Sequence, residues 1–476
     1  MVFSGLTFLL IFFPVVIILL LLNRDLRYQN GVLLGASLLF YGWGEPKWIL
    51  AMIGVTLVNY VCAILFSRKR LRKVVKRFLL IIGIAASLGV LFYFKYAAFL
   101  INSINQLLGI HRTIPAAVLP IGISFYTFQA LTYTVDVYRG KSPVQRNFFK
   151  LLLYISCFPQ LIAGPIVQYS DIVAQIDDRK ITMKSFTAGM PRFITGLAKK
   201  AILANFCGMV LNTLGTAETG PLTVIGAWFG AITYSLQIYF DFSAYSDMAI
   251  GMGRMLGFTY KENFNYPYAA DSVTDFWRRW HISLGSFFRD YVYIPLGGNR
   301  VRPLRHALNL MIVWGLTGLW HGASWNFVCW GLMYGVLLLF EKFVLGKALY
   351  RIPSGIRRCF TLFFVMVGWV LFYYVDMSDG ITHVLALFGL SSKGDTLALI
   401  DEKTGFLLLK YGLPILLACV LSTPLCHHLA AIYRQRNKER RCGYYLVSTT
   451  LLLALLALSI IFLIGQSYNP FIYFRF

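Results

Sequence analysis

Residues 307–340 read ALNLMIVWGLTGLWHGASWNFVCWGLMYGVLLLF and contain no aspartate, glutamate, lysine or arginine. A helix needs about 20 mainly apolar residues to cross a bilayer, so this stretch predicts a short pair of helices that crosses the lipid and returns. Gly322 can end the first helix in a left-handed cap, and Ser324 can cap the start of the second. His321 is then an ionisable residue at a helix break at membrane depth, which makes it a functional candidate.

The composition of the whole chain agrees with lipid as its solvent. Of its 476 residues, 58% are hydrophobic and 13% are charged, whereas soluble domains carry about 25% charged residues. Twelve apolar segments are candidate spans: residues 5–22, 30–43, 48–66, 78–100, 115–138, 192–213, 222–250, 307–322, 324–341, 360–376, 405–429 and 444–465. Because these cannot all be full crossings, we predict an all-α polytopic membrane protein with about 11 transmembrane helices in a single domain, residues 1–476.

Two further apolar segments are interrupted by charged or helix-breaking residues. Residues 151–170 contain two prolines and a glycine, and residues 276–299 contain three arginines, Asp290 and a proline. Broken backbone at membrane depth is tolerated only where protein or water surrounds it. We therefore predict that both are re-entrant or interfacial segments that line a cavity.

The basic residues that give the chain its net charge of +24 lie mainly in the loops between the apolar segments. Basic residues gather in alternate loops, at 67–77, 139–150, 179–200, 254–261, 300–305, 342–358 and 434–441. The loops between them, at 43–47, 101–113, 215–221 and 377–404, have little basic charge. The positive-inside rule places the first set in the cytoplasm and both termini outside a bacterial-type cell membrane, so the charge requires no nucleic-acid partner.

Metal and disulfide chemistry are not expected from the sequence. The eight cysteines show no CxxC spacing, and the HExxH, Walker-loop and GxSxG motifs are absent from the sequence. We therefore predict no bound metal or cofactor and no disulfide bonds.

The neighbours of His321 in the sequence are Trp320, Trp325 and Asn326, which we predict to line its cavity. A buried imidazole that stays neutral can accept a proton, as a general base for a hydroxyl nucleophile must. The alternative is a packed histidine bonded to a backbone carbonyl. We favour the functional interpretation, because an idle ionisable group is costly in lipid.

A second histidine, His281, lies in the segment DFWRRWHISLGSFFRDYVYIPLGGN, residues 275–299. A continuous helix here would pair Arg279 with the aspartate four residues before it and would align Trp280 with His281 in an aromatic stripe. Arg278 and Arg279 can meet a phosphate-bearing donor at the cytoplasmic mouth, because arginine matches phosphate bidentately. They can equally anchor an amphipathic helix to anionic lipid.

Four polar residues are candidates for structural roles. Asp241, Ser243 and Asp247 lie in YFDFSAYSDM, near the cytoplasmic end of an apolar helix. We expect their hydrogen bonds to orient neighbouring helices, and we prefer this to direct catalysis. Asp290 interrupts the second broken segment.

The last residues of the chain, 466–476, are predicted to form an external tail. Tyr468, Phe471, Tyr473 and Phe474 give this tail an aromatic character. They can dock a partner or form part of an aromatic belt at the membrane surface, and the belt is our preferred interpretation.

Three stretches are the most distinctive: NYPYAADSVTDFWRRWHISL at 265–284, FRDYVYIPLGGNR at 288–300 and GLWHGASWNFVCWG at 318–331. In these residues the chain resembles the membrane-bound O-acyltransferases, in their alginate O-acetyltransferase branch. Weaker similarities at 1–14, 120–140, 158–166 and the closing NPFIYFRF extend the resemblance over nearly the whole chain.

The resemblance implies a helical fold around a central tunnel, with a catalytic core at about residues 115–345. It implies that His321 matches the essential histidine of the family and that His281 matches the second polar position, which is histidine in this branch. We expect His281 to stabilise developing charge or to protonate the departing thiolate. The family moves an acyl group, here expected to be acetyl, from acetyl-CoA or an acylated carrier in the cytoplasm to a hydroxyl on the other side. Its relatives modify exopolysaccharides such as alginate, often with an extracytoplasmic esterase-like partner.

Two other activities remain as alternatives. A D-alanyl transferase of the sister branch would take its donor from a carrier protein. A transporter of lipid-linked glycan would equally need polar groups, broken helices and a cavity. Phospholipid synthesis is disfavoured, because the sequence lacks the HxxxxD motif of the glycerolipid acyltransferases.

Overall fold

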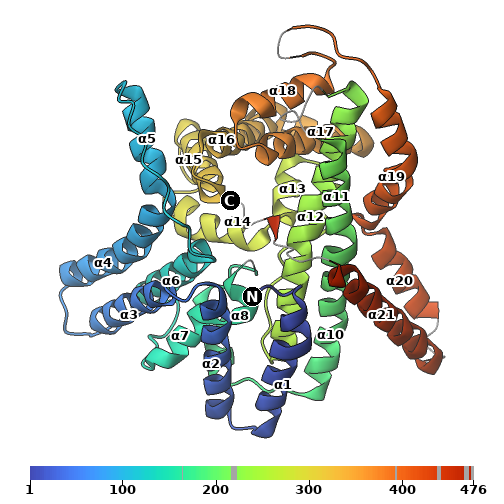
Figure 1. Ribbon diagram of the computed structural model, residues 1–476. Coiled ribbons are helices and arrows are strands. Elements are labelled where there is room, and N and C mark those ends of the chain that lie inside the picture. The colour runs from blue at the N-terminus through green and yellow to red at the C-terminus, as the bar shows by residue number, and fades with distance from the viewer. Residues whose placement is uncertain (163, 216–221, 392–393, 437–440, 466–470, 473–476) are drawn as a thin grey trace. The chain divides into compact units, whose positions relative to one another are not determined.

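The computed structural model describes residues 1–162, 164–215, 222–391, 394–436, 441–465 and 471–472. Within these ranges the regular structure is helical, with one isolated bridge between Leu390 and Thr396, so the predicted all-α fold is confirmed. The α-helices (Figure 1) are α1 Phe13–Leu22, α2 Leu26–Gly44, α3 Ile49–Phe66, α4 Lys73–Leu91, α5 Ala97–Leu107, α6 Ile123–Tyr138, α7 Phe148–Ser156, α8 Phe158–Leu161, α9 Tyr169–Asp177, α10 Met183–Ala198, α11 Asn205–Leu214, α12 Val224–Met255, α13 Val273–Arg279, α14 Ile282–Phe288, α15 Pro303–His321, α16 Trp325–Leu339, α17 Ser354–Tyr373, α18 Met377–Leu387, α19 Glu402–Leu421, α20 Leu425–Arg436 and α21 Arg441–Ile464. π-helical turns lie at Phe8–Phe12, Phe92–Tyr96, Lys199–Ala204, Arg289–Tyr293 and Phe340–Leu345, and 3-10 turns at Pro267–Ala269 and Gly346–Arg351.

Seven helical stretches of the described chain are long and apolar enough to cross a membrane. They are Ile49–Phe66, Lys73–Leu107, Met183–Leu214, Trp325–Arg351, Ser354–Tyr373, Glu402–Leu421 and Tyr445–Ile464. Phe8–Leu22 is a shorter apolar helix. The polytopic architecture is therefore confirmed, and the total of about 11 crossings stays a prediction.

Two predicted spans are shorter than the apolar pattern suggested. The span predicted at 115–138 becomes helical only at Ile123, because Pro115 and Pro120 have no amide hydrogen to donate to a helical ladder. The span predicted at 405–429 breaks between α19 and α20, where Pro424 follows Ser422 and Thr423. In both places the helix boundary lies close to a proline, although the apolar residues continue beyond it.

The described chain divides into two compact units. Unit 1 is Met1–Phe193, Tyr245–Glu262 and Ser467–Phe474, and unit 2 contains Ile194–Ala244 and Asn263–Gln466. Both catalytic candidates, His281 and His321, belong to unit 2.

Hydrogen bonds join three helices of unit 1 in its core. Asn59 of α3 donates to Ser87 of α4 at 2.8 Å and accepts from Thr134 of α6. A Cβ on Gly83 of α4 would lie 3.1 Å from both Asn59 and Thr134, so the glycine permits this close approach. In lipid, small residues and interhelical hydrogen bonds of this kind hold helices together.

The broken segment 151–170 is buried within unit 1. Asn147 caps α7, because its side-chain oxygen accepts from the backbone amides of Phe149 and Lys150. Residues 151–162, which include the end of α7 and all of α8, are buried. Protein therefore surrounds this broken backbone, as its predicted position at membrane depth requires.

The tail residue Phe471 is only 1% exposed. Its ring lies edge-on at 4.5 Å from Tyr245, which stacks on Phe3 at 4.5 Å in the same unit. Phe471 is therefore an interior residue, and the prediction that it belongs to an exposed belt or docking surface is wrong. The other tail aromatics, Tyr468, Tyr473 and Phe474, lie outside the described residues.

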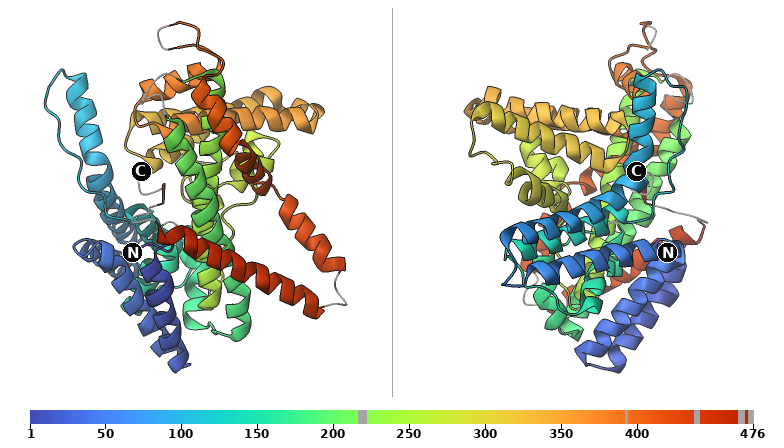
Figure 2. Two further views of the ribbon diagram at one scale, coloured as in Figure 1. Left: turned by 45° about the vertical axis from the view of Figure 1, so that its right-hand side comes forward. Right: turned by 90° about the vertical axis from the view of Figure 1, so that its left-hand side faces the viewer.

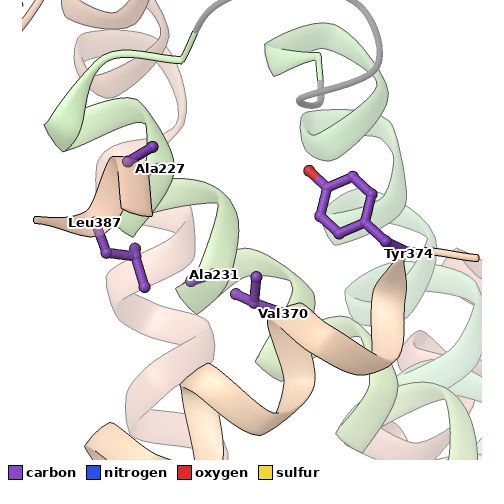
Figure 3. Close-up of a cluster of buried hydrophobic side chains, with 6 residues drawn as sticks. Ala227, Ala231, Val370, Tyr374 and Leu387 are labelled. Atoms are coloured by element: carbon purple, nitrogen blue, oxygen red, sulfur yellow. The ribbon is translucent and has the colours of Figure 1, made fainter. Parts of the chain in front are cut away.

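A core cluster of unit 2 packs α12 against α17 and α18 (Figure 3). Ala227 and Ala231 of α12 give Val370 and Tyr374 room to approach the helix closely. The Tyr374 hydroxyl lies 2.9 Å from His383 Nδ1, and His383 Nε2 donates to the Ala227 carbonyl at 3.0 Å. His383 is therefore a buried structural histidine that ties α18 to α12.

The flanks of two predicted external loops meet in unit 2. Lys403 donates to the carbonyl of Leu214 at 2.8 Å, and the hydroxyls of Thr223 and Thr404 are 3.2 Å apart. The end of α11 and the start of α19 therefore lie at the same end of the unit. The low basic charge of the two adjoining loops leads to the same expectation.

Candidate active site

The backbone breaks at His281, between the short helices α13 and α14. Trp280 is extended, and His281 has φ of 45° and ψ of 53°, in the left-handed region. The ion pair of Arg279 with Asp275 forms at 2.9 Å, but the predicted continuous helix with an aligned Trp280–His281 stripe is wrong. A left-handed residue other than glycine costs roughly 1–2 kcal/mol and persists only where its surroundings impose it.

The segment around Asn263 imposes this conformation. The carbonyl of Asn263 accepts from the amide of Ile282 at 3.0 Å, and the amide of Asn265 donates to the carbonyl of Arg279 at 2.9 Å. The side-chain oxygen of Asn263 also accepts from the amide of Ser283 at 3.1 Å and lies 3.2 Å from His281 Nδ1. No local pattern in the sequence indicates this role of Asn263, because its partner is 18 residues away in the chain.

His321 is the last residue of α15. Gly322, which follows, is extended with φ of −164° and ψ of 152°, so the predicted left-handed cap is wrong. Ser324 does occupy the residue before α16, but its side chain makes no capping hydrogen bond. The extended residues after His321 turn the chain so that α16 runs back along α15.

Two glycines bring α15 and α16 into backbone contact. A Cβ on Gly318 would lie 2.1 Å from the carbonyl oxygen of Phe327, and one on Gly331 would lie 2.2 Å from that of Trp314. Figure 2 shows the two helices side by side. Because no side chain separates them, the end of α15 that carries His321 is held in a fixed place.

One indole ring touches both histidines. The ring of Trp320 lies 5.6 Å from that of His281 and 4.9 Å from that of His321. The histidines are 2% and 4% exposed, respectively. The rings of Trp330 and Phe372 each lie 5.1 Å from His321. The structure therefore brings the two predicted histidines into one aromatic, water-poor environment.

A pocket of about 180 Å³ opens beside His281. Its walls are mainly aromatic and aliphatic residues of α13, α14 and α15, together with Trp280 of the break between α13 and α14. The polar members of its lining include His281, Thr317, Tyr293 and Arg289. His321 is not part of this lining, so the pocket reaches only one of the two histidines.

The polar end of the pocket carries cationic side chains. Arg289 is exposed and pairs with Asp290 at 2.8 Å. The Tyr293 hydroxyl lies 2.9 Å from His306 Nε2, and the ammonium of Lys342 lies 3.2 Å from the same nitrogen. An anionic group that enters the pocket at this end would therefore meet positive charge.

Several residues predicted to line a tunnel do not line this pocket. Arg278 is exposed on α13, Arg279 pairs with Asp275, and Trp325 is 57% exposed at the start of α16. Asn326 donates to the carbonyl oxygens of Leu371, at 2.7 Å, and of Tyr374. It therefore satisfies the end of α17, and a side chain committed to two carbonyls contributes structure to the site.

Lys200 and Asp241 form an ion pair at 2.6 Å in unit 2, with side chains only 3% and 4% exposed. Asp241 precedes Phe242, whose ring lies 4.6 Å from that of His281. The pair thus joins the π-helical turn Lys199–Ala204 to the part of α12 that packs on the site.

Asp241→Asn is expected to destabilise the protein by about 3–5 kcal/mol, because it leaves a buried ammonium without its carboxylate. Thermal unfolding in detergent measures the effect, and the double variant Lys200→Met with Asp241→Leu should recover most of the loss. Lys261→Met removes an exposed pair with Asp171 and is the matched control, with an expected change below about 1 kcal/mol. Equal losses of stability for Asp241→Asn and Lys261→Met would contradict this structural role of the buried pair.

None of the remaining polar candidates has a recorded hydrogen bond or ion pair with His281 or His321 among the described residues. Asp247 accepts from Arg192 at 2.8 Å in unit 1, and Arg192 also bonds to Glu262. Ser243 is buried, and Asp290 pairs with its neighbour Arg289. Among the described residues, no group of three or more His, Cys, Asp or Glu side chains could hold a metal ion.

The model of the membrane-bound O-acyltransferase family, MBOAT, matches residues 58–347, which include both histidines and the pocket. The chain belongs to this family. Over its full length this acyltransferase is 37% identical to the whole probable alginate O-acetylase AlgI of Pseudomonas putida. It is 41% identical to the Pseudomonas aeruginosa protein of the same name over 78% of the chain and 72% of that relative.

A third relative is named for a different acceptor. The chain is 31% identical to the peptidoglycan O-acetyltransferase of Helicobacter pylori, over 93% of the chain and 90% of that protein. The resemblance inferred from the motifs is confirmed, and the chain is an O-acyltransferase enzyme with several apolar helices long enough to span a membrane.

Proposed function

We propose that this enzyme transfers an acetyl group from a cytoplasmic thioester, acetyl-CoA or an acylated carrier, to a hydroxyl outside the cell membrane. The acceptor is a polysaccharide, or an esterase-like partner that passes the group on. The observation that carries this proposal is the pair of buried imidazoles against one indole, with a pocket opening beside one of them. The activities for which the relatives are named support acetyl as the group transferred and a polysaccharide as the acceptor.

The proposed reaction uses His321 as a general base. His321 takes the proton of the acceptor hydroxyl, and the oxygen attacks the carbonyl carbon of the thioester. A carbon–oxygen bond forms, the carbon–sulfur bond breaks, and a thiolate leaves. The proton from the hydroxyl ends on the sulfur, so the products are an ester and a free thiol. His281 lies where it can act on the thioester carbonyl or on the departing sulfur.

The pocket beside His281 is the proposed site of the donor. Its aromatic and aliphatic walls exclude water, which protects a thioester from hydrolysis. Its polar end has Arg289 and Tyr293, and Tyr293 contacts His306 next to the basic loop 300–305. The positive-inside rule assigns that loop to the cytoplasm, so we propose that the donor enters there and that both termini lie outside.

Arg289→Gln is expected to raise the KM for acetyl-CoA by about 10-fold, because an arginine–phosphate contact is a charge-assisted hydrogen bond worth about 1.5–3 kcal/mol, reduced here by exposure. The measurement is the steady-state release of thiol by the purified enzyme. Arg278→Gln is the matched control, because Arg278 is an exposed arginine outside the pocket lining.

A truncated donor sharpens the Arg289 experiment. S-acetyl-N-acetylcysteamine is a thioester without phosphate, so Arg289→Gln should leave its KM unchanged. An equal rise for both donors would show that the variant perturbs the pocket in general. An unchanged KM for both donors would show that the phosphate of acetyl-CoA does not bind at Arg289.

The activity itself is tested with the purified enzyme in liposomes, supplied with an acetyl-thioester outside and with candidate glycans inside and outside. Acetyl ester on the glycan, together with an equal amount of thiol, supports the transferase. Movement of a lipid-linked glycan without thiol release would support the transporter instead. Mass spectrometry of the surface glycan of cells with and without the gene then identifies the acceptor.

A further inference from the structure

The left-handed backbone of His281 is held by an asparagine that the mechanism above does not use. We propose that Asn263 is a positioning residue, which keeps the proton of the neutral His281 ring on Nδ1 and so leaves the Nε2 lone pair as a proton acceptor. The inference rests on the proposed function, because it assigns the state in which one of the two active-site histidines works.

The contact with Ser283 identifies the oxygen of the Asn263 side chain. The backbone amide of Ser283 lies 3.1 Å from the Asn263 atom that also faces His281. A backbone amide can only donate, so this atom is the carboxamide oxygen. His281 Nδ1 lies 3.2 Å from the same oxygen. An oxygen without a hydrogen can only accept, so Nδ1 must carry the proton.

The hydroxyl of Ser283 also lies close enough to the ring to compete as a donor to Nδ1. It lies 2.8 Å from the Asn263 oxygen and 3.4 Å from His281 Nδ1. A hydroxyl has a single hydrogen, and the shorter contact takes it. Nδ1 is therefore the donor to Asn263, and because a neutral imidazole carries one proton, its Nε2 carries a lone pair.

Backbone bonds make the position of the ring rigid. The Asn263 carbonyl accepts from Ile282, directly after His281, and Asn265 donates to Arg279, two residues before it. Asn263 is fully buried, so bulk water does not compete for its oxygen. One short segment thus fixes both the strained backbone of His281 and the tautomer of its ring.

The tautomer restricts what His281 can do. A neutral ring with its lone pair on Nε2 accepts a proton and cannot donate a hydrogen bond to a developing oxyanion from that nitrogen. It becomes a donor there only after protonation. Of the two roles considered for His281, protonation of the thiolate fits this state: the proton that His321 takes from the hydroxyl passes to Nε2 of His281, and the protonated ring then delivers it to the sulfur.

The charged and titratable groups near His281 belong to its pocket lining, to α15 and to α12. Arg289 and Tyr293 share its pocket lining, and His321 contacts the other side of its neighbour Trp320. On α12, Phe242 faces the ring, and the adjacent carboxylate is paired with a lysine. A new charge at position 263 would be closer to the ring than these, because residue 263 bonds to it directly.

Asn263→Asp keeps the accepting oxygen and adds a negative charge, which favours the protonated ring. Because the working ring is neutral, the acid limb of the kcat/KM profile should move to higher pH by about one unit, with activity retained above it. Asn265→Asp is the matched control: it makes the same change in the same segment, on an exposed residue whose contact to the break is through its backbone. Its acid limb should stay in place.

Asn263→Leu removes the acceptor and is expected to lower kcat by about 10-fold, roughly the value of one hydrogen bond between neutral groups, with the donor KM within about 2-fold. Nitrogen-15 NMR of enzyme with labelled histidines measures which ring nitrogen of His281 carries the proton, and it does not require turnover. The signal of His281 is the one that is missing from the spectrum of His281→Asn. We expect the proton on Nδ1 in the wild type and a mixed state in Asn263→Leu.

An unchanged acid limb in Asn263→Asp, or a proton found on Nε2 in the wild type, would overturn the inference. The two proposals fail in different ways. An enzyme without acyl transfer refutes the proposed function, and the NMR measurement still decides the tautomer.

Discussion

His321→Ala is expected to reduce acyl transfer by at least about 100-fold, because general base catalysis typically contributes about 10²–10⁴-fold. His321 is 4% exposed, and Trp320, Trp330 and Phe372 surround its ring. The rate of thiol release, with saturating donor and acceptor, measures the loss as a fall in kcat.

His383→Ala is the matched control for this experiment. His383 is also a buried histidine of unit 2, but it bridges Tyr374 and the carbonyl of Ala227. Its loss should lower the unfolding temperature, while the protein that remains folded keeps its specific activity. If His321→Ala behaved in the same way, with a lower unfolding temperature and normal kcat, His321 would be a packing residue.

His281→Asn is expected to be folded and to lose activity by about 10²–10⁴-fold, the range of general acid–base catalysis. Asparagine tolerates the left-handed conformation that His281 adopts, with φ of 45°. Its amide nitrogen can donate to Asn263 as Nδ1 does, but it has no atom at the position of Nε2. The variant therefore removes one nitrogen and keeps the local backbone.

Two measurements separate this effect from misfolding. The unfolding temperature of His281→Asn should lie within a few degrees of the wild type, and the acceptor and donor KM values should change little. His281→Ala should be both inactive and less stable, because alanine does not favour the left-handed region. Near-normal turnover by His281→Asn would show that Nε2 takes no part in the reaction.

The broad architecture followed from the sequence because lipid imposes a strong rule on it. The 34 uncharged residues at 307–340 had to form apolar helices, and a histidine among them had to be protected from lipid. The motifs around His281 and His321 identified the family, and the family model covers both. Periodicity, composition and motifs were sufficient for these conclusions, because each of these patterns is formed by residues that are close together in the chain.

The local geometry of the site did not follow from these patterns. The pattern at 275–288 favoured one helix, and the structure has two, because the hydrogen bonds from the Asn263 segment outweigh the helical preference at His281. Trp325 and Asn326 are next to His321 in the chain, yet one is exposed and the other bonds to carbonyls at the end of α17. Proximity in the sequence was a poor guide to the lining of the pocket.

The sequence alone thus identified the chain as a helical membrane acyltransferase and led to the prediction that His281 and His321 are its catalytic residues, because hydropathy, charge in the loops and motifs are properties of contiguous residues. Only the tertiary structure decided that Trp320 touches both imidazoles, that Arg289 rather than Arg278 lines the pocket, and that Asn263 holds the ring of His281. These contacts join residues that are far apart in the chain or separated by a helix break, and their hydrogen-bond geometry leaves no local signal in the sequence.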